Sequence, residues 1–466
     1  MNIVLINTNR IKPPIGPVGL EYVAEALHRE GHTPEILDLC WEEDVESAIQ
    51  RFFSRGDYSL VGLTIRNTDD CVYGSKQSFL EEHAEIVTFI HRVSDALLVL
   101  GGVGFSVMPE FVLDKVRADT GIWGDGEFTF PRLAACLDRN EDWRGLPNLL
   151  HKEGKQWIQN RIYTSSLKDL PHMHRGWFDN RRYYDEGGQA GFESKRGCPG
   201  NCIYCADPVA KGRDVRLRPP SAVVCELRSL VQKGIFHLHT CDSEFNIVEE
   251  HAVSVCEEII RENLSERMQW YAYCSPVPFS PRLARLMHRA GCVGINFGTD
   301  SGDEQMLKRL GRNHTTHDIS QIVRYCREEG ITVMIDLLLG SPGESEESIR
   351  CTIELMKRIQ PDCVGISAGV RVYPGTGISA MIAERGLKDG IVGDPGHGQP
   401  VFFIEPQVTK DLFELLERFI DEDRRFFFLN PFKSKASYNY NANQKLIDAI
   451  RSGSRGAYWD ILRKSY

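Results

Sequence analysis

The sequence has no excess of basic residues and no long apolar run. Its 466 residues include 55 Lys and Arg against 65 Asp and Glu, which gives a net charge of −10. Proteins that bind nucleic acids usually present a basic surface, so this balance argues against a nucleic-acid partner. No apolar stretch is long enough to span a bilayer, and residues 1–5 lack the basic start and apolar core of a secretory signal. These absences predict a cytoplasmic protein without a membrane span.

Two familiar motifs are also missing. No Gly-x-Gly-x-x-Gly follows the first apolar run, which argues against an ordinary dinucleotide site. No second Cys-x-x-Cys pair stands at the spacing typical of a zinc ribbon. The 14 cysteines belong to a long chain without an export signal, so we expect most of them to stay reduced.

The most informative stretch is a short loop at residues 195–206. Cys198, Cys202 and Cys205 follow the spacing C-x-x-x-C-x-x-C, and the turn formers at 199–201 allow the loop to curl. Thiolates are the preferred ligands of iron–sulfur clusters and also of zinc. Structural zinc usually has four protein ligands, whereas three cysteines suit a four-iron cluster that keeps one iron free for a small molecule. We therefore predict a cluster, with zinc as the alternative.

Apolar runs alternate with helical patterns along most of the chain, which is typical of an α/β protein. Before residue 140, five runs predict a parallel, Rossmann-like sheet with strands at 3–6, 34–39, 60–65, 96–100 and 119–122. After residue 190, six further repeats predict a partial (β/α)6 barrel with strands at 192–197, 235–240, 269–273, 293–298, 331–339 and 363–369. Parallel barrels carry their chemistry at the carboxyl ends of the strands, and the cysteine loop follows the first barrel strand.

The same patterns predict the domain organisation. We expect a Rossmann-like domain at 1–140, a linker at 141–190, a barrel at 191–385 and a small, mainly helical segment at 386–466. Within the last segment, the spacing of apolar residues predicts an amphipathic helix at Asp411–Leu429. This segment either covers the open side of the barrel or packs as an ordinary small core.

The cysteine loop, with Tyr204 before its third cysteine, resembles the signature of the radical S-adenosylmethionine (SAM) enzymes. The resemblance implies a [4Fe-4S] cluster on Cys198, Cys202 and Cys205, with the free iron holding the amino and carboxylate groups of SAM. An electron from the cluster then cleaves SAM to methionine and a 5′-deoxyadenosyl radical. It also implies an external electron donor such as a flavodoxin or ferredoxin.

Further loops are similar to the SAM-binding loops of that family. Residues 239–246 resemble its Asp-Asp-x-Phe loop, residues 298–304 its GIESG loop, and residues 338–344 its GLPGE loop. Relatives often place an arginine after the third barrel strand, where this chain has Tyr273 and Ser275. By this resemblance we expect SAM to contact Tyr204, Ala206, Asp242, Glu244, Tyr273, Ser275, Gly298, Asp300, Ser301 and Leu339.

The N-terminal region resembles the cobalamin-binding domain that precedes the barrel in one class of radical SAM enzymes. The resemblance rests on the runs at 13–32, 101–110 and 121–127. It implies a cobalamin site formed by Thr64, Arg66, Gly101, Gly102, Gly104, Gly124 and Glu127.

This chain departs from part of that class in one motif. It lacks the Asp-x-His-x-x-Gly motif whose histidine ligates cobalt from below. Either cobalt has no protein ligand on that face, or the domain has lost its cofactor. Arg66 is either a cation near that face, where it would disfavour a water ligand, or an ordinary surface or helix-capping residue.

Together these features predict a cobalamin-dependent, class B radical SAM methyltransferase. Its expected substrate is a carbon atom of a small molecule or natural-product intermediate. A radical SAM cyclase, oxidase or rearrangement enzyme that binds cobalamin is the first alternative, and a non-catalytic electron carrier is the second. The sequence does not indicate a catalytic acid or base.

Overall fold

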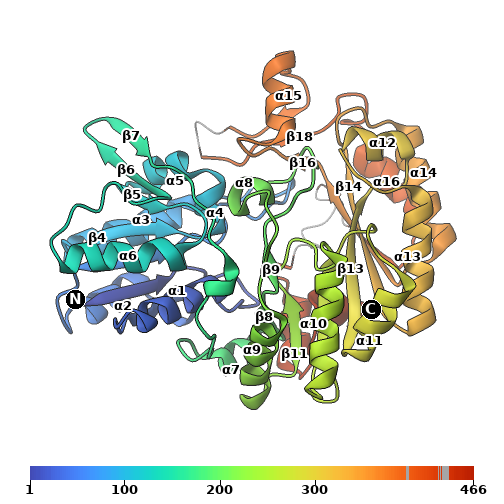
Figure 1. The fold of residues 1–466 in the computed structure, drawn as a ribbon. Coiled ribbons are helices and arrows are strands. Elements are labelled where there is room, and N and C mark those ends of the chain that lie inside the picture. Colours follow the sequence, from blue (N-terminus) through green and yellow to red (C-terminus); the bar gives the residue numbers. More distant parts are fainter. Residues whose placement is uncertain (395–397, 429, 431, 433–439, 466) are drawn as a thin grey trace.

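Two mainly parallel β-sheets organise the chain, and they lie side by side in Figure 1. The computed structural model describes residues 1–394, 398–428, 430, 432 and 440–465. Helices flank both sheets, as expected for parallel strands whose two faces are both apolar.

The first sheet has the strand order β2-β1-β3-β4-β5-β6-β7. Its five predicted strands are confirmed as β1 (Ile3–Asn7), β2 (Glu35–Asp38), β3 (Leu60–Thr64), β4 (Leu97–Gly101) and β5 (Thr120–Ile122), all parallel. The connecting helices are α1 (Val18–Arg29), α2 (Val45–Phe53), α3 (Leu80–Val93), α4 (Val103–Val107), α5 (Pro109–Val116) and α6 (Gly126–Asp138). The strand order reverses between β1 and β3, and such a switch point opens a ligand crevice at the carboxyl ends of the strands.

The segment expected to be a linker extends this sheet. Strands β6 (Leu149–Glu153) and β7 (Gln156–Gln159) form an antiparallel hairpin, and β6 pairs with β5. Gly154, at φ +61°, makes the tight turn between them. Helix α7 (Asn180–Gly187) then leads to the second sheet. The sequence pattern did not predict these two strands, because they are short and lie in a segment rich in prolines and histidines.

The second sheet contains seven parallel strands in the order β19-β15-β14-β13-β12-β11-β8. Five of the six predicted strands are confirmed as β11 (His237–Thr240), β12 (Gln269–Cys274), β13 (Cys292–Asp300), β14 (Thr332–Leu339) and β15 (Cys363–Ala368). The strand predicted at 192–197 is wrong, because the first strand of this sheet is β8 (Ala190–Phe192) and ends where the prediction begins. The Ser194 and Lys195 amides bond to Asp242 instead, and β9 (Lys195–Arg196) pairs with β10 (Arg216–Leu217) in a separate two-stranded sheet. The helices around it are α9 (Pro220–Gln232), α10 (Glu249–Arg261), α11 (Pro281–Arg289), α12 (Glu304–Arg309), α13 (Thr316–Glu329) and α14 (Glu346–Ile359).

The seventh strand corrects the prediction of one helix at Asp411–Leu429. Helix α16 (Leu412–Ile420) ends early, because Asp421 and Glu422 adopt left-handed backbone conformations. The chain then forms β19 (Phe426–Phe427), which pairs with β15. Leu429 lies outside the described residues. The sequence has no glycine or proline to signal this helix end, and only pairing with β15 makes the two phenylalanines a strand.

The remaining strands and α-helices are short. They are β9 (Lys195–Arg196), β10 (Arg216–Leu217), α8 (Asp207–Lys211), β16 (Val370–Arg371), α15 (Gly377–Arg385), β17 (Ile391–Val392), β18 (Phe402–Phe403), α17 (Gln444–Arg451) and α18 (Tyr458–Ser465).

A buried ionic network joins the two sheets through α1 and α9. The Glu226 carboxylate accepts bonds from Arg175 at 2.8 Å and Arg218 at 2.6 Å, and Tyr22 donates to it. Arg175 also pairs with Glu21. Burial opposes ionisation of Glu226, but the two guanidinium groups hold its pKa below the usual value.

We expect Glu226→Leu to lower the thermal unfolding midpoint by several degrees. The change leaves two buried cations without their shared anion, which costs about 3–5 kcal/mol. Glu257→Leu is the matched control, because Glu257 pairs with Arg282 at the surface and such pairs contribute about 1 kcal/mol or less. Equal midpoints for the two variants, measured by calorimetry, would contradict the role assigned to the network.

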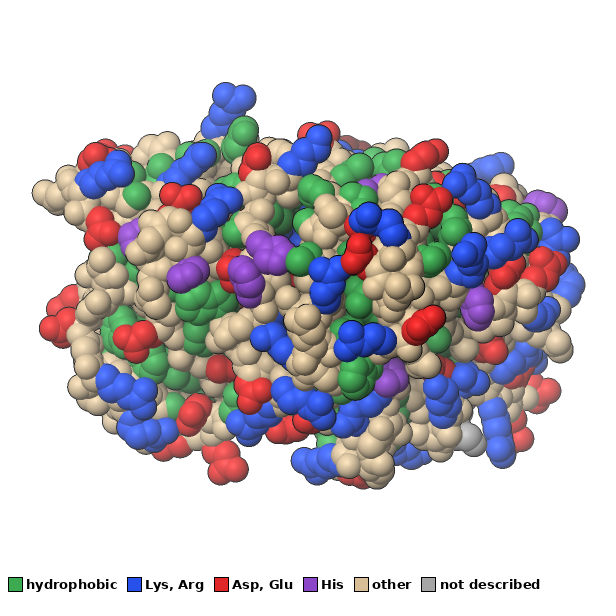
Figure 2. Space-filling model, turned by 60° about the horizontal axis from the view of Figure 1, so that its bottom comes forward, with side chains coloured by type: hydrophobic (Ala, Val, Ile, Leu, Met, Phe, Trp, Pro, Cys, Tyr) green, Lys and Arg blue, Asp and Glu red, His purple; other side chains and the backbone are tan. Residues whose placement is uncertain are grey.

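The surface gives no sign of a single dominant charge. Figure 2 shows acidic and basic side chains interspersed over one face. In the described part of the chain, no helix is both long and apolar enough to cross a membrane.

Candidate cofactor and substrate site

The cysteine loop lies between β9 and α8 and is held from three directions. The Cys198 amide donates to Gly212 O at 3.1 Å, and the Ile203 amide donates to Leu310 O at 3.0 Å. Ile203 O in turn accepts a bond of 2.7 Å from the Ile378 amide at the start of α15. The loop is therefore fixed by backbone bonds to segments far away in sequence, which preorganises its side chains.

The three thiols are free and their arrangement suits a cluster. Gly200 lies between two of them, since a Cβ atom there would be 3.3 Å from Cys198 Sγ and 3.8 Å from Cys202 Sγ. No three His, Cys, Asp or Glu side chains in the described ranges are gathered as ligands of one metal ion. In an iron–sulfur cluster each cysteine ligates a different iron, so the thiols need not converge on one ion. The donor set thus fits a cluster better than zinc.

Arg312 is a site residue that the sequence analysis missed. Its guanidinium donates to Cys202 Sγ at 2.9 Å and to Gly298 O, and pairs with Asp300 at 3.3 Å. Burial raises the pKa of the Cys202 thiol, and Arg312 opposes that effect. The only signal in the sequence is an arginine after Gly311, and that glycine allows the chain to pass close to Asn201 O.

Asp300 lies at the centre of this group. It has φ +67°, which is rare for a residue other than glycine, and its carboxylate accepts a 2.6 Å bond from the Tyr204 hydroxyl. Burial raises the pKa of Asp300, and Arg312 opposes the shift. Such strained backbone persists where surrounding contacts hold it, and it is common at functional sites.

Two carboxylates of the next loop have different environments. Asp242 accepts bonds from the Ser194 and Lys195 amides and from the Ser194 hydroxyl, so it fixes the strand that enters the cysteine loop. Glu244 has a buried Oε2 without a hydrogen-bond partner. Burial raises its pKa to about 7, against the effect of Arg312 and Lys195. Glu244 is thus available to a ligand, whereas the Asp242 oxygens are already bonded within the chain.

The other residues expected at SAM occupy varied positions. Ser275 exchanges backbone bonds with the Asn246 side chain, Ser301 lies beside Thr352, and Leu339 is buried in the core. Ala206 caps the start of α8, and Gly298 contacts Arg312 through its carbonyl. Tyr273 is 41% exposed although it lies inside the sheet.

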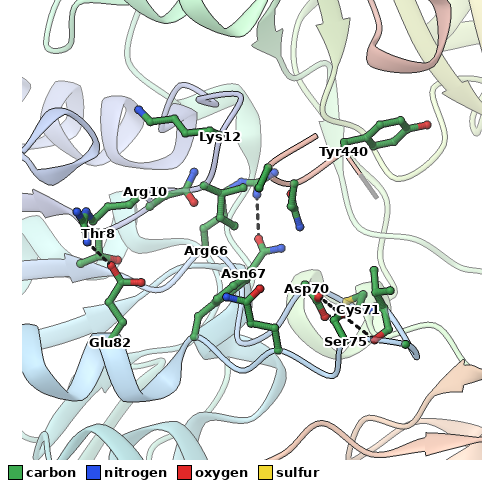
Figure 3. Close-up of a pocket in the computed structure, with 18 of the residues that line it drawn as sticks. Thr8, Arg10, Lys12, Arg66, Asn67, Asp70, Cys71, Ser75, Glu82 and Tyr440 are labelled. Atoms are coloured by element: carbon green, nitrogen blue, oxygen red, sulfur yellow. Dashed lines mark hydrogen bonds and ion pairs between the residues drawn. The ribbon is translucent and has the colours of Figure 1, made fainter. Parts of the chain in front are cut away.

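A cavity of about 1090 Å3 lies at the switch point of the first sheet. Its walls include residues 8–12 after β1, residues 66–67 after β3 and residues 366–369 at the end of β15. In the close-up of Figure 3, the loops after β1 and β3 carry Arg10, Lys12 and Arg66 around this space. The cavity is therefore bordered by the carboxyl ends of both sheets, and it is large enough for a ligand of drug size or more.

Arg66 is a member of this cavity wall and reaches toward the second sheet. Its guanidinium donates to Asn67 at 3.0 Å, and the groups that interact with its charge are Tyr458, Cys241, Tyr273 and Cys71. Burial lowers the pKa of Arg66, and no described carboxylate forms an ion pair with it. Arg66 is therefore a half-buried cation that lines a ligand cavity and has no ion-pair partner among the described residues, so it is available to a bound ligand.

The glycines expected near cobalamin support the strand that carries Arg66. A Cβ atom at Gly102, which has φ +100°, would be 2.5 Å from Ile65 O, and one at Gly104 would be 3.0 Å from the Arg66 backbone. Gly101 O accepts a bond from the Ile65 amide. These glycines allow close packing of β4 and α4 on the end of β3.

The remaining expected cobalamin residues lie around the same sheet edge. Thr64 accepts a bond from Thr8 through its carbonyl, the Gly124 amide donates to Ser106, and Glu127 pairs with Arg196 of β9. Of the seven residues expected to bind cobalamin, Arg66 is among the described residues that line the cavity, and the other six are not.

Comparison with known families gives two matches along the chain. Residues 4–134 match the B12 binding domain, and residues 192–356 match the radical SAM superfamily. The two matched segments correspond to the two sheets, and the cysteine loop lies within the second.

Individual relatives cover most of the chain. The chain is 30% identical over 447 residues to tryptophan 2-C-methyltransferase of Streptomyces laurentii. This match covers 82% of this chain and 74% of that protein. It is 25% identical over 367 residues to hopanoid C-3 methylase of Methylococcus capsulatus, covering 77% and 67%.

One solved structure is similar over its whole length. The radical SAM methyltransferase TsrM from Kitasatospora setae, with tryptophan and a SAM analogue bound, has a TM-score of 0.91 and 28% identity, covering 99% of this chain and 98% of that one. A second structure of the same enzyme contains cobalamin and a [4Fe-4S] cluster, also with a TM-score of 0.91.

Proposed function

This chain belongs to the cobalamin-dependent radical SAM methyltransferases, and from that membership we propose that it transfers a methyl group from SAM to a carbon atom of a small molecule. The observation that carries the proposal is the cavity between the two sheets. It is bordered by Arg66 on the B12-domain side and by the end of β15 on the radical SAM side. The cavity therefore connects the switch point expected to hold cobalamin with the carboxyl end of the radical SAM sheet.

The residues of the chain divide into two groups. Cys198, Cys202 and Cys205 hold the cluster, and Arg312 supports Cys202. Cobalamin would bind at the switch point of the first sheet, where Arg66 lines the cavity. When bound, cobalamin supplies a carrier for the methyl group, and the cluster supplies a free iron for SAM.

For SAM, we propose that Glu244 receives the amino end near the cluster. Its Oε2 is the buried oxygen without a partner, and Arg312 and Asp300 lie beside it in the same charged group. Tyr204, Ala206, Tyr273, Ser275, Gly298, Ser301 and Leu339 remain proposed contacts, whereas Asp242 orients the strand before the cysteine loop.

The substrate class follows from the relative that covers most of the chain. The substrate of that relative is tryptophan, and we infer an aromatic amino acid or a related amine for this chain. We also propose that an external protein donates the electron.

The proposed domains are a Rossmann-like domain at 1–140, a barrel at 191–385 and a small C-terminal segment at 386–466. Within the connecting segment at 141–190, the β6–β7 hairpin belongs to the first sheet.

The test is an anaerobic assay of the reconstituted protein with SAM, cobalamin and candidate aromatic amines. S-adenosylhomocysteine together with a methylated product is the expected result, followed by mass spectrometry. Formation of 5′-deoxyadenosine without either product would favour a cyclase, oxidase or rearrangement enzyme. If none of these compounds forms with any substrate, the enzyme assignment is wrong.

We expect Arg66→Leu to change the absorbance spectrum of bound cobalamin. Leucine is apolar and carries no charge. The variant therefore lacks the cation that would disfavour a water ligand on cobalt. Arg10→Leu is the matched control, because Arg10 lines the same cavity but is paired with Glu82 at 2.7 Å. Identical corrin spectra for wild type and Arg66→Leu would show that Arg66 does not face cobalt.

A further inference from the structure

The strands of the second sheet carry polar side chains on their inner face. Alternate residues such as Leu238, Ala272, Ile295 and Ile335 belong to the core beneath the helices. Because side chains alternate along a strand, the residues between them face the interior of the sheet. We call four of these inward residues, one from each of β11 to β14, the lumen layer: His239, Tyr273, Asn296 and Asp336.

A packed hydrophobic cluster, which we call the floor, lies next to the lumen layer on the side of the amino ends of the strands. Tyr271, Met334 and Cys363 precede it on the same inner face and pack in one cluster with Trp459 and Leu462 of α18. The Tyr271 hydroxyl donates to Asp460 at 2.8 Å. This cluster fills the inner face toward the amino ends of the strands, on the side of the lumen layer away from the cysteine loop.

Space is available next to Asp336. The neighbours of Asp336 in the strand register are Gly298 on β13 and Gly365 on β15, neither of which has a side chain. A Cβ atom at Gly298 would be 3.7 Å from Glu244 Oε1 and 3.8 Å from Arg312 Nη2, so these two side chains border the space on that side. Tyr273 is 41% exposed, and the charges that act on it are those of Asp336, Cys241 and Arg66. Asp336 thus has no side-chain neighbour at its own level on either adjacent strand.

The lumen layer offers acceptors without matching donors. Asn296 is 3% exposed and its Oδ1 has no hydrogen-bond partner. The His239 Nδ1 is 2.8 Å from Thr240 O, and burial lowers the His239 pKa to about 4, so the neutral ring keeps an acceptor at Nε2. Asp336 forms no ion pair with any residue that the structure describes. A buried acceptor set of this kind lacks a cation.

From this geometry we propose that the lumen layer binds the primary ammonium group of the substrate, with Asp336 as its anion and the residue that selects for amines. The inference rests on the proposed function, because it assigns the substrate's amine to the interior of the same site. The Arg312 cation is paired with Asp300, and SAM has Glu244 nearer the cluster, so Asp336 is left for a second ligand.

The charge state agrees with this role. Burial, together with the nearby Asp300, raises the pKa of Asp336 to about 7, whereas Asn296 lowers it. Of the other groups near Asp336, Tyr273 and His239 are neutral, whereas Glu244 and Arg312 border the neighbouring Gly298, and Arg312 is paired with Asp300. A bound ammonium group would therefore hold the Asp336 carboxylate in its charged form.

The test compares matched ligands that differ only in the amine. Tryptophan and indole-3-propionate form one pair, and tryptamine and 3-ethylindole form another; each is titrated into the anaerobic holoenzyme by calorimetry. We expect the wild type to bind the amine of at least one pair about tenfold or more tightly than its partner, as for hydrogen bonds to a charged group. We expect Asp336→Asn to reduce that preference to about twofold or less, and Asp336→Glu to restore part of it.

Two controls separate this role from a merely structural one. Asp95→Asn, at an exposed position of the first sheet, should keep the amine preference of the wild type. SAM affinity and cluster absorbance should be unchanged in Asp336→Asn. The proposal is wrong if no amine binds, if both members of every pair bind equally, or if Asp336→Asn loses SAM rather than the preference. Failure of methyl transfer with the preference intact would instead overturn the proposed function alone.

Discussion

Replacing Cys202 by alanine is expected to abolish the iron–sulfur cluster and with it all turnover. Cys202 is one of three thiols in a fixed loop, and two thiols leave a second iron without a protein ligand. The anaerobically reconstituted variant should lose the visible absorbance of the cluster and nearly all bound iron. Product formation should fall by about a thousandfold or more, since the chemistry belongs to the cofactor.

Cys136→Ala provides the matched control for this experiment. Cys136 is a free, half-buried cysteine on α6 of the other sheet, so its loss removes a thiol without touching the loop. Its variant should retain the iron content and absorbance of the wild type. If Cys202→Ala also retains both, the ligand assignment is wrong.

The second large effect is expected from Arg312→Ala. This change removes the donor to Cys202 Sγ and leaves the buried Asp300 carboxylate without its cation. Breaking a buried pair in this way costs about 3–5 kcal/mol, so the thermal unfolding midpoint should fall by several degrees. A hydrogen bond and a positive charge near a cluster sulfur both favour the reduced form, so the reduction potential should become more negative.

The potential separates a role at the cluster from a role in stability alone. Arg312→Lys should keep much of the charge effect but lose the forked contacts to Cys202, Gly298 O and Asp300. Arg289→Ala, at an exposed position on α11, should change neither quantity. An unchanged potential in Arg312→Ala, measured by spectroelectrochemistry, would leave Arg312 as a purely structural residue.

The two predictions concern one connected site. Arg312 joins the cysteine loop to Asp300 on β13, and Tyr204 of the loop donates to the same carboxylate. A substitution in any of these residues is thus expected to affect the others, and double variants should not be additive. The strained backbone at Asp300 is held in place by this set of contacts.

The sequence by itself determined the features that depend on local pattern. The cysteine spacing with turn formers at 199–201 specifies a ligand loop, because all its donors lie within a few residues of one another. The apolar runs specified ten of the strands in the two sheets, since buried parallel strands are apolar on both faces. The start of α11 is likewise local, because the Ser280 side chain accepts a bond from the Leu283 amide and Pro281 occupies the first turn.

Only the tertiary structure decided which distant segments meet. Arg312 is 110 residues from Cys202, and no periodicity relates the two positions. The strand at Phe426–Phe427 exists because β15 offers it a partner, and the hairpin at 149–159 because β5 does. The lumen layer and its floor likewise depend on strand register and on α18 packing inside the sheet. Such contacts arise from folding of the whole chain, whereas hydrophobic pattern encodes only which face of each element is buried.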